Sequence, residues 1–147
     1  MELRQINIPH RACRLLLSFW VLALLIACTV PLYEPVGLGL PPSISTQQTM
    51  SAIASGIRLG GWKLVSSHNL GYVAQLSNYD EEARVRIDYD PGLRIVSFRY
   101  LDSKNMQYAE GSYGKEISFS YNIKLEEMEK AVAIKLAELI TAKSLAH

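Results

Sequence analysis

Ala83-Arg84-Val85-Arg86-Ile87-Asp88-Tyr89 is the stretch that decides the fold, because apolar and charged residues alternate along it. In a strand, Val85, Ile87 and Tyr89 would lie on one face, and both arginines and Asp88 on the other. This period of two is typical of an antiparallel sheet with one covered face and one face in water. Arg94 to Leu101 repeats the pattern, with Val96, Phe98 and Tyr100 on its covered face.

Two further strands are expected ahead of this pair, at Trp62 to His68 and at Tyr72 to Ser77. Short turn sequences separate the four strands: Asn69-Leu70-Gly71, Asn78-Tyr79-Asp80 and Asp90-Pro91-Gly92. In the last turn, proline presets φ and Gly92 accepts a positive φ. Connections this short join antiparallel neighbours, so the sequence predicts a four-stranded meander, followed by an irregular stretch from Asp102 to Lys115.

One helix is predicted on each side of the strands. Ser45 begins the first, since Gln48 three residues later completes a capping box, and Gly60 suits the left-handed position after its end. The second is expected from Phe119 or Tyr121 to Lys143, with its apolar residues in one stripe. The predicted fold class is therefore α+β: a two-layer, four-stranded antiparallel meander with an N-terminal and a C-terminal helix on one face.

The front of the chain has the three parts of a secretory signal peptide. Met1 to Arg14 is basic, Leu15 to Ala27 is apolar and uncharged, and the small residues Ala27 and Cys28 close it. An apolar run this short is too brief to cross a bilayer comfortably, which takes about 20 helical residues. An uncleaved membrane anchor and an ordinary secreted protein are the alternatives.

Leu25-Ile26-Ala27-Cys28 resembles the lipobox of bacterial lipoproteins. The resemblance implies cleavage between Ala27 and Cys28, a diacylglycerol on the Cys28 thiol and acylation of the new amino group. Cysteine suits that role because its thiolate is a good nucleophile. In such proteins an Asp after the cysteine tends to retain the protein at the inner membrane. Thr29 therefore implies an outer-membrane protein facing the periplasm.

Three regions follow: a lipoprotein signal peptide over 1–27, a lipidated N-terminus with a Pro- and Gly-rich tether over 28–44, and an α+β domain over 45–147. The alternative to the tether is a loop packed on the domain. Of the 15 basic and 14 acidic residues, three and one lie in residues 1–27, so the remainder has a net charge near −1. That balance does not indicate nucleic-acid binding. The two cysteines are Cys13 and Cys28, so the processed domain would hold no disulfide and no zinc site of His/Cys type.

Several short motifs resemble a group of small proteobacterial lipoproteins of unassigned function. They are Ala52-Ile53, Gly61-Trp62, Val85 to Tyr89, Arg99 to Asn105, and Tyr121-Asn122. The chain departs from that pattern at Ser118, where a histidine is frequent, and at Lys124, where a tryptophan is common. The resemblance implies a lipidated helix–four-strand–helix domain and brings no activity with it.

Lys63, Arg84, Arg86 and Arg99 would share the wet face of the sheet with Asp88. Guanidinium groups donate bidentate hydrogen bonds, so this face could hold a carboxylate or a phosphate. The alternative is a solvated face whose charges oppose aggregation. The polar run from Asp102 to Asn105 could form a small site or satisfy turn backbone groups, with Tyr100, Tyr108 and Tyr121 clustered near it.

Catalysis has little support in the sequence. Triad chemistry needs a histidine held by a carboxylate, and His68 has no partner that the sequence identifies. A carboxylate pair for glycoside hydrolysis cannot be assigned from Asp88, Asp90 and Asp102. We therefore expect no enzyme, no catalytic residue, no metal and no cofactor. The leading expectation is a lipid-anchored envelope protein that binds another envelope protein or assists assembly. The alternative is a binder of an anionic envelope ligand: a lipid headgroup, lipopolysaccharide or peptidoglycan.

Overall fold

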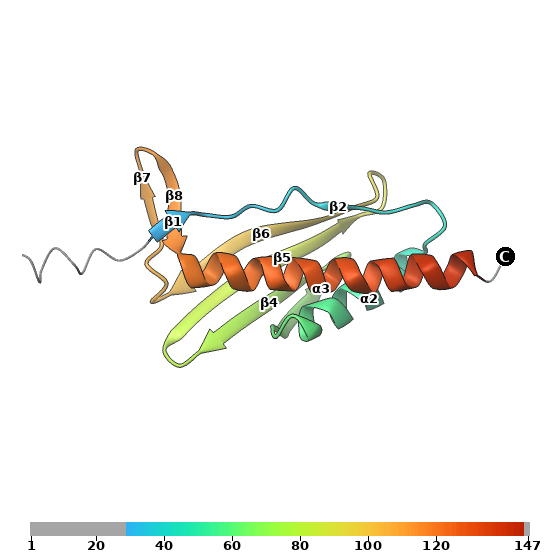
Figure 1. Ribbon diagram of the computed structural model, residues 1–147, viewed down its shortest axis with the longest axis horizontal. Coiled ribbons are helices and arrows are strands. Elements are labelled where there is room, and N and C mark those ends of the chain that lie inside the picture. Colours follow the sequence, from blue (N-terminus) through green and yellow to red (C-terminus); the bar gives the residue numbers. More distant parts are fainter. Residues whose placement is uncertain (1–28, 146–147) are drawn as a thin grey trace, which may run out of the picture.

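The computed structural model describes residues 29–145, which form an α+β fold with two helices and antiparallel sheets (Figure 1). The α+β class is confirmed. The strands are β1 (Thr29–Pro31), β2 (Leu38–Gly39), β3 (Lys63–His68), β4 (Gly71–Asn78), β5 (Glu81–Asp90), β6 (Ile95–Lys104), β7 (Ala109–Gly111) and β8 (Gly114–Ser118). The helices are α2 (Thr46–Leu59) and α3 (Phe119–Ser144).

The larger sheet has the strand order β2-β6-β5-β4-β3, so β3 to β6 pair in chain order as short turns require. The alternation along β5 divides its side chains as expected. Val85 and Ile87 are fully buried and Tyr89 nearly so, whereas Arg84 and Arg86 are exposed. The buried side chains pack with those of α2 and α3, so both helices lie on the covered face and the opposite face meets solvent.

The predicted four-stranded meander with a helix at each end describes the fold only in part. A fifth strand, β2, pairs with β6, and a second sheet has the order β1-β8-β7. β7 and β8 form a short hairpin that begins in the stretch expected to be irregular and continues past its end at Lys115 to Ser118. Its strands alternate too briefly to give a sequence signal, and Ile117 is its one fully buried residue.

The segment expected to be a tether packs on the domain between Thr29 and Leu40. Thr29 to Pro31 pair with β8, Leu38 and Gly39 pair with β6, and the Leu40 amide donates to Arg94 O at 2.8 Å. Its leucines pack against the core, and this apolar contact holds a segment whose prolines and glycines gave no strand period. The structure thus follows the alternative of a loop packed on the domain.

Two side chains fasten this segment. The Asn122 amide accepts from Tyr33 N at 3.0 Å and donates to Pro31 O at 2.8 Å, which mimics a strand partner. At the other end, the Arg94 guanidinium donates to the carbonyls of Leu40, Pro41 and Ile44. A guanidinium with several donors in one plane suits such a cluster of carbonyls.

Helix α2 begins as predicted, with a complete capping box between Ser45 and Gln48. Its end differs from the prediction, because Gly61 (φ +82°) and not Gly60 (φ −72°) takes the left-handed conformation. The turn after β5 differs likewise: Arg94 has φ +58°, and Gly92 does not have a positive φ. There the Asp90 carboxylate accepts from the amides of Gly92 and Leu93, which fixes the turn without a left-handed glycine.

Helix α3 runs the length of the molecule and buries one stripe, including Tyr121, Leu125, Met128 and Val132 (Figure 1). Its start agrees with the sequence prediction at Phe119. Within residues 29–145 no helix is long and apolar enough to span a membrane. The predicted signal cleavage and lipidation residues, Ala27 and Cys28, lie outside the described residues.

Candidate functional site

The outward face of the five-stranded sheet brings the four predicted basic residues together. Lys63, Gln75, Arg84 and Asp102 form one row across β3 to β6, and Arg86 and Arg99 face each other in the next. All four basic side chains are exposed. We call this surface the outward sheet face. It also exposes Val65 and Leu101, each about two-fifths accessible (41%), so it is mixed in character.

Two of the four basic residues are paired with carboxylates. Arg84 binds Asp102 through two parallel hydrogen bonds, of which Nε to Oδ1 measures 2.8 Å. Arg86 Nε donates to both oxygens of Asp88, at 3.0 and 2.8 Å. The Arg84 hydrogen bonds lower the pKa of Asp102 and raise that of Arg84 itself. These pairs are half exposed, so they fix side-chain positions more than they stabilise the fold.

Among the residues that the structure describes, Lys63 and Arg99 differ from Arg84 and Arg86 in having no carboxylate partner. Among residues 29–145, neither has a carboxylate within ion-pair distance, although Arg99 stands directly opposite Arg86. The local excess of positive charge on this face is therefore near Arg99 and Lys63. The sequence predicted this face but not which of its cations are paired, because pairing depends on strand register.

His68 has a carboxylate neighbour that the sequence did not reveal. Register brings His68, Gly71 and Asp88 into one row, and His68 Nε2 lies 3.5 Å from Asp88 Oδ1. That nitrogen is buried without a hydrogen-bond partner in the described part of the chain. Asp88 is already bound to Arg86, so its carboxylate holds the arginine in place beside His68.

The polar run from Asp102 to Asn105 is engaged in local structure. Asp102 binds Arg84, the hydroxyls of Ser103 and Tyr100 are 2.9 Å apart, and Asn105 Nδ2 donates to Asp80 O at 2.9 Å. Asn105 has φ +59°, a conformation that Asn tolerates. These contacts correspond to the turn-stabilising role that the sequence left open beside a binding role.

The predicted tyrosine cluster forms at the edge of the core. Tyr100 stacks on Tyr108 with ring centroids 4.6 Å apart, and Tyr121 meets Tyr100 edge-on at 5.7 Å. Burial raises the pKa of Tyr121, whose hydroxyl has no hydrogen-bond partner within residues 29–145. The hydrogen bond that Tyr108 donates to Glu110 raises the pKa of Tyr108 to about 12.

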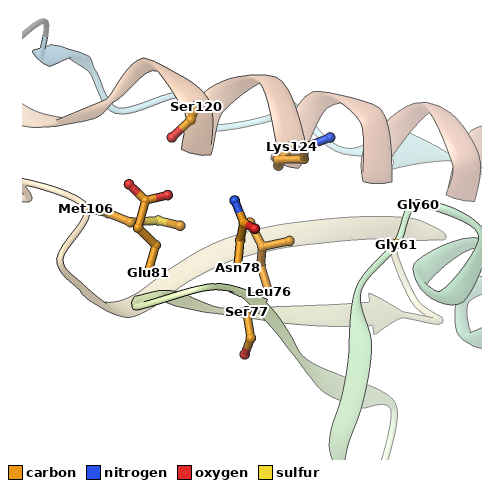
Figure 2. A pocket seen from close by; sticks show the side chains of 9 residues that line it. All are labelled: Gly60, Gly61, Leu76, Ser77, Asn78, Glu81, Met106, Ser120 and Lys124. Atoms are coloured by element: carbon orange, nitrogen blue, oxygen red, sulfur yellow. The ribbon is translucent and has the colours of Figure 1, made fainter.

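One pocket of about 320 Å³ lies between the β4–β5 turn, the end of α2 and the start of α3 (Figure 2). Buried Met106 lies at its back, and Asn78, Glu81, Ser120 and Lys124 supply its polar groups. Lys124 Nζ is 2.7 Å from Glu127, so its charge is partly neutralised by its own helix. In the described ranges no group of His, Cys, Asp and Glu side chains is arranged to hold a metal ion.

No protein-family model, curated protein or solved structure matches the chain. The lipoprotein resemblance therefore stays a prediction from the sequence, and the site is interpreted from its own geometry.

Proposed function

We propose that the chain is a lipid-anchored cell-envelope protein, held in the membrane through Cys28, whose domain is a non-catalytic interaction or assembly module. The observation that carries this proposal is the basic and apolar front that ends in Leu25-Ile26-Ala27-Cys28. Only one peptide bond separates Cys28 from Thr29, the first residue of β1. The outer membrane, with the domain facing the periplasm, is the proposed location.

The outward sheet face is the proposed surface for the protein partner. It combines exposed Val65 and Leu101 with arginines held in place by carboxylates. Apolar contact with ordered arginines is the composition found at protein interfaces. The side chains are pre-positioned, which lowers the entropy cost of association.

The lipid anchor is tested by the intact mass of the protein extracted from membranes, beside a Cys28→Ala variant. We expect a mass that corresponds to Cys28 to His147 plus acyl chains, and loss of membrane attachment in the variant. The mass of the unprocessed chain would refute the anchor.

The interaction surface is tested by a photo-cross-linking amino acid at Ser97, on the outward sheet face, in living cells. We expect a discrete cross-linked product that disappears when Arg99→Glu is added. Arg58→Glu is the matched control, because Arg58 is an exposed arginine at the end of α2. A product that survives Arg99→Glu, or no product, would refute this surface.

The second candidate is a binder of an anionic envelope ligand through Lys63, Arg84, Arg86 and Arg99. The juxtaposition of Arg86 and Arg99 across β5 and β6 favours it. Binding of phosphorylated lipopolysaccharide to the purified protein should then weaken with salt, and in the Arg84→Ala, Arg86→Ala double variant. Equal binding by that variant would exclude this candidate.

A further inference from the structure

The start of the described chain marks one end of the elongated domain. Thr29 is opposite Ser118 at the base of the β7–β8 hairpin, and Ser118 N donates to Met106 O at 2.8 Å. Asn105 next to it binds Asp80 in the β4–β5 turn. Figure 1 shows β1, both of these turns and the start of α3 at the same end of the long axis. We call this end the β1 end.

Exposed aromatic residues gather at the β1 end. Tyr79 in the β4–β5 turn and Tyr113 in the β7–β8 turn are fully accessible (103% and 101%), and Phe119 at the start of α3 is 57% accessible. Figure 1 shows the two turns on opposite sides of β1. Tyr79 also has φ +53°, a left-handed backbone conformation that is uncommon for a residue other than glycine. Being fully accessible, the rings of Tyr79 and Tyr113 make almost no contact within the domain and are available to an outside surface.

Resting on the proposed lipid anchor, we infer that the β1 end lies on the bilayer, with Tyr79 and Tyr113 in the headgroup region on either side of the acylated Cys28. The proposed lipid anchor identifies the bilayer as the surface that this end contacts. The acyl chains on Cys28 would insert into the membrane, and consecutive Cα atoms are about 3.8 Å apart, so Thr29 would lie next to it. Tyrosine rings favour the membrane–water interface, where the ring and the hydroxyl meet suitable surroundings. The long axis of the domain then stands away from the membrane.

The charge of this end indicates which lipids it contacts. Asp80, Glu81 and Glu82 follow Tyr79 directly, and Glu110 and Glu116 lie in the β7–β8 hairpin. The cations of the same strands are fewer: Lys104, opposite Glu82, and Lys115, opposite Glu110. Acidic side chains next to the contact oppose binding to anionic headgroups. The contact is therefore aromatic and directed to zwitterionic lipid, and it does not require anionic lipid.

The test uses the full chain, produced and processed in bacteria and reconstituted in phosphatidylcholine vesicles that carry spin-labelled lipid. Tyr79→Cys and Tyr113→Cys each receive a fluorescent thiol label. Leu93→Cys is the matched control, because Leu93 is exposed (72%) in the β5–β6 turn at the opposite end. Ser112→Cys reports on the hairpin with Tyr113 in place.

We expect the labels at positions 79, 112 and 113 to lose emission to headgroup-level quenchers, and the label at 93 to lose none. Adding anionic lipid should not increase the quenching, because the acidic side chains beside Tyr79 oppose anionic headgroups. An equal loss of emission at all four positions would overturn the inferred orientation, as would a loss at position 93 alone. Quenching that appears only with anionic lipid would overturn the aromatic basis of the contact.

Failure of the anchor itself would be seen separately. In the processed chain Cys13 has been removed and Cys28 is a thioether, so the parent protein should take up no thiol label. A parent chain that labels, or that has the unprocessed mass, refutes the lipid anchor rather than the orientation.

Discussion

Gly56→Ala tests how closely α2 and α3 pack. The change raises helix propensity, which stabilises the fold, but it adds a methyl group between the helices, which destabilises the fold if they are in close contact. Gly56 is buried in α2, and a Cβ there would lie 2.4 Å from Val132 Cα and 2.8 Å from Val132 Cγ2. Favourable carbon–carbon contacts are about 3.5–4.0 Å long, so α3 would have to move by about 1 Å. Val132 is fully buried, which leaves it little room to move.

The magnitude follows from these two effects. Helix propensity favours alanine over glycine by about 1 kcal/mol, whereas overpacking a core costs about 1–3 kcal/mol and occasionally more. Backbone–backbone overlap places this site at the upper end of that range, so we expect a net loss of about 1–2 kcal/mol. For a domain of this size that corresponds to a fall in Tm of about 5–15 °C.

The assay is thermal unfolding of the purified protein, followed by circular dichroism. Ser55→Ala is the matched control, because Ser55 is the preceding residue, is exposed and binds only Ser51 O of its own helix. Propensity alone acts there, so its Tm should rise slightly or stay unchanged. A Gly56→Ala protein with a Tm equal to or above that of the parent would refute the close approach of α2 and α3.

Three further predictions concern other contacts. Asn122→Ala removes both hydrogen bonds to the segment at Tyr33 and should cost about 1–2 kcal/mol with faster amide exchange over residues 29–40; unchanged exchange would contradict it. The pKa of Asp102 is lowered in the fold, so its contribution is present above its unfolded value of about 3.9 and is lost as the pH falls through the folded value. The urea midpoint of the parent should therefore fall more than that of Asp102→Asn below about pH 4, and parallel curves would argue against the Arg84 interaction. Gly71→Ala places a Cβ 2.6 Å from Ile87 O and should lower the free energy of unfolding in urea by about 1–3 kcal/mol, whereas an unchanged urea midpoint would show that β4 can shift.

Patterns that depend on a few neighbouring residues could be predicted from the sequence. The alternation of Val85 and Ile87 predicts a buried face, and the spacing of Ser45 and Gln48 predicts a capping box; both are present. These features are set by local geometry, the period of a strand and the reach of a side chain over one helical turn.

Features that depend on long-range pairing could not be predicted. β2 has two residues next to a glycine with φ +96°, and its stability comes from pairing with β6 and from leucines that pack on the core. The proximity of His68 and Asp88 requires the register of three strands, which no short motif specifies. The left-handed residue after β5 is Arg94, and its guanidinium binds carbonyls at least 50 positions away in the chain.

The packing of β1 determines what a lipid on Cys28 would do to the domain. Thr29 to Pro31 pair with β8 and Leu32 N donates to Lys115 O, so any rotation relative to the anchor is confined to the bonds next to Thr29. β5 and β6 run along the long axis of the molecule (Figure 1). With the β1 end on the bilayer, the outward sheet face would stand upright and face sideways along the membrane. Such an orientation favours partners anchored in the same leaflet, whereas a long flexible tether would equally have served partners distant from it.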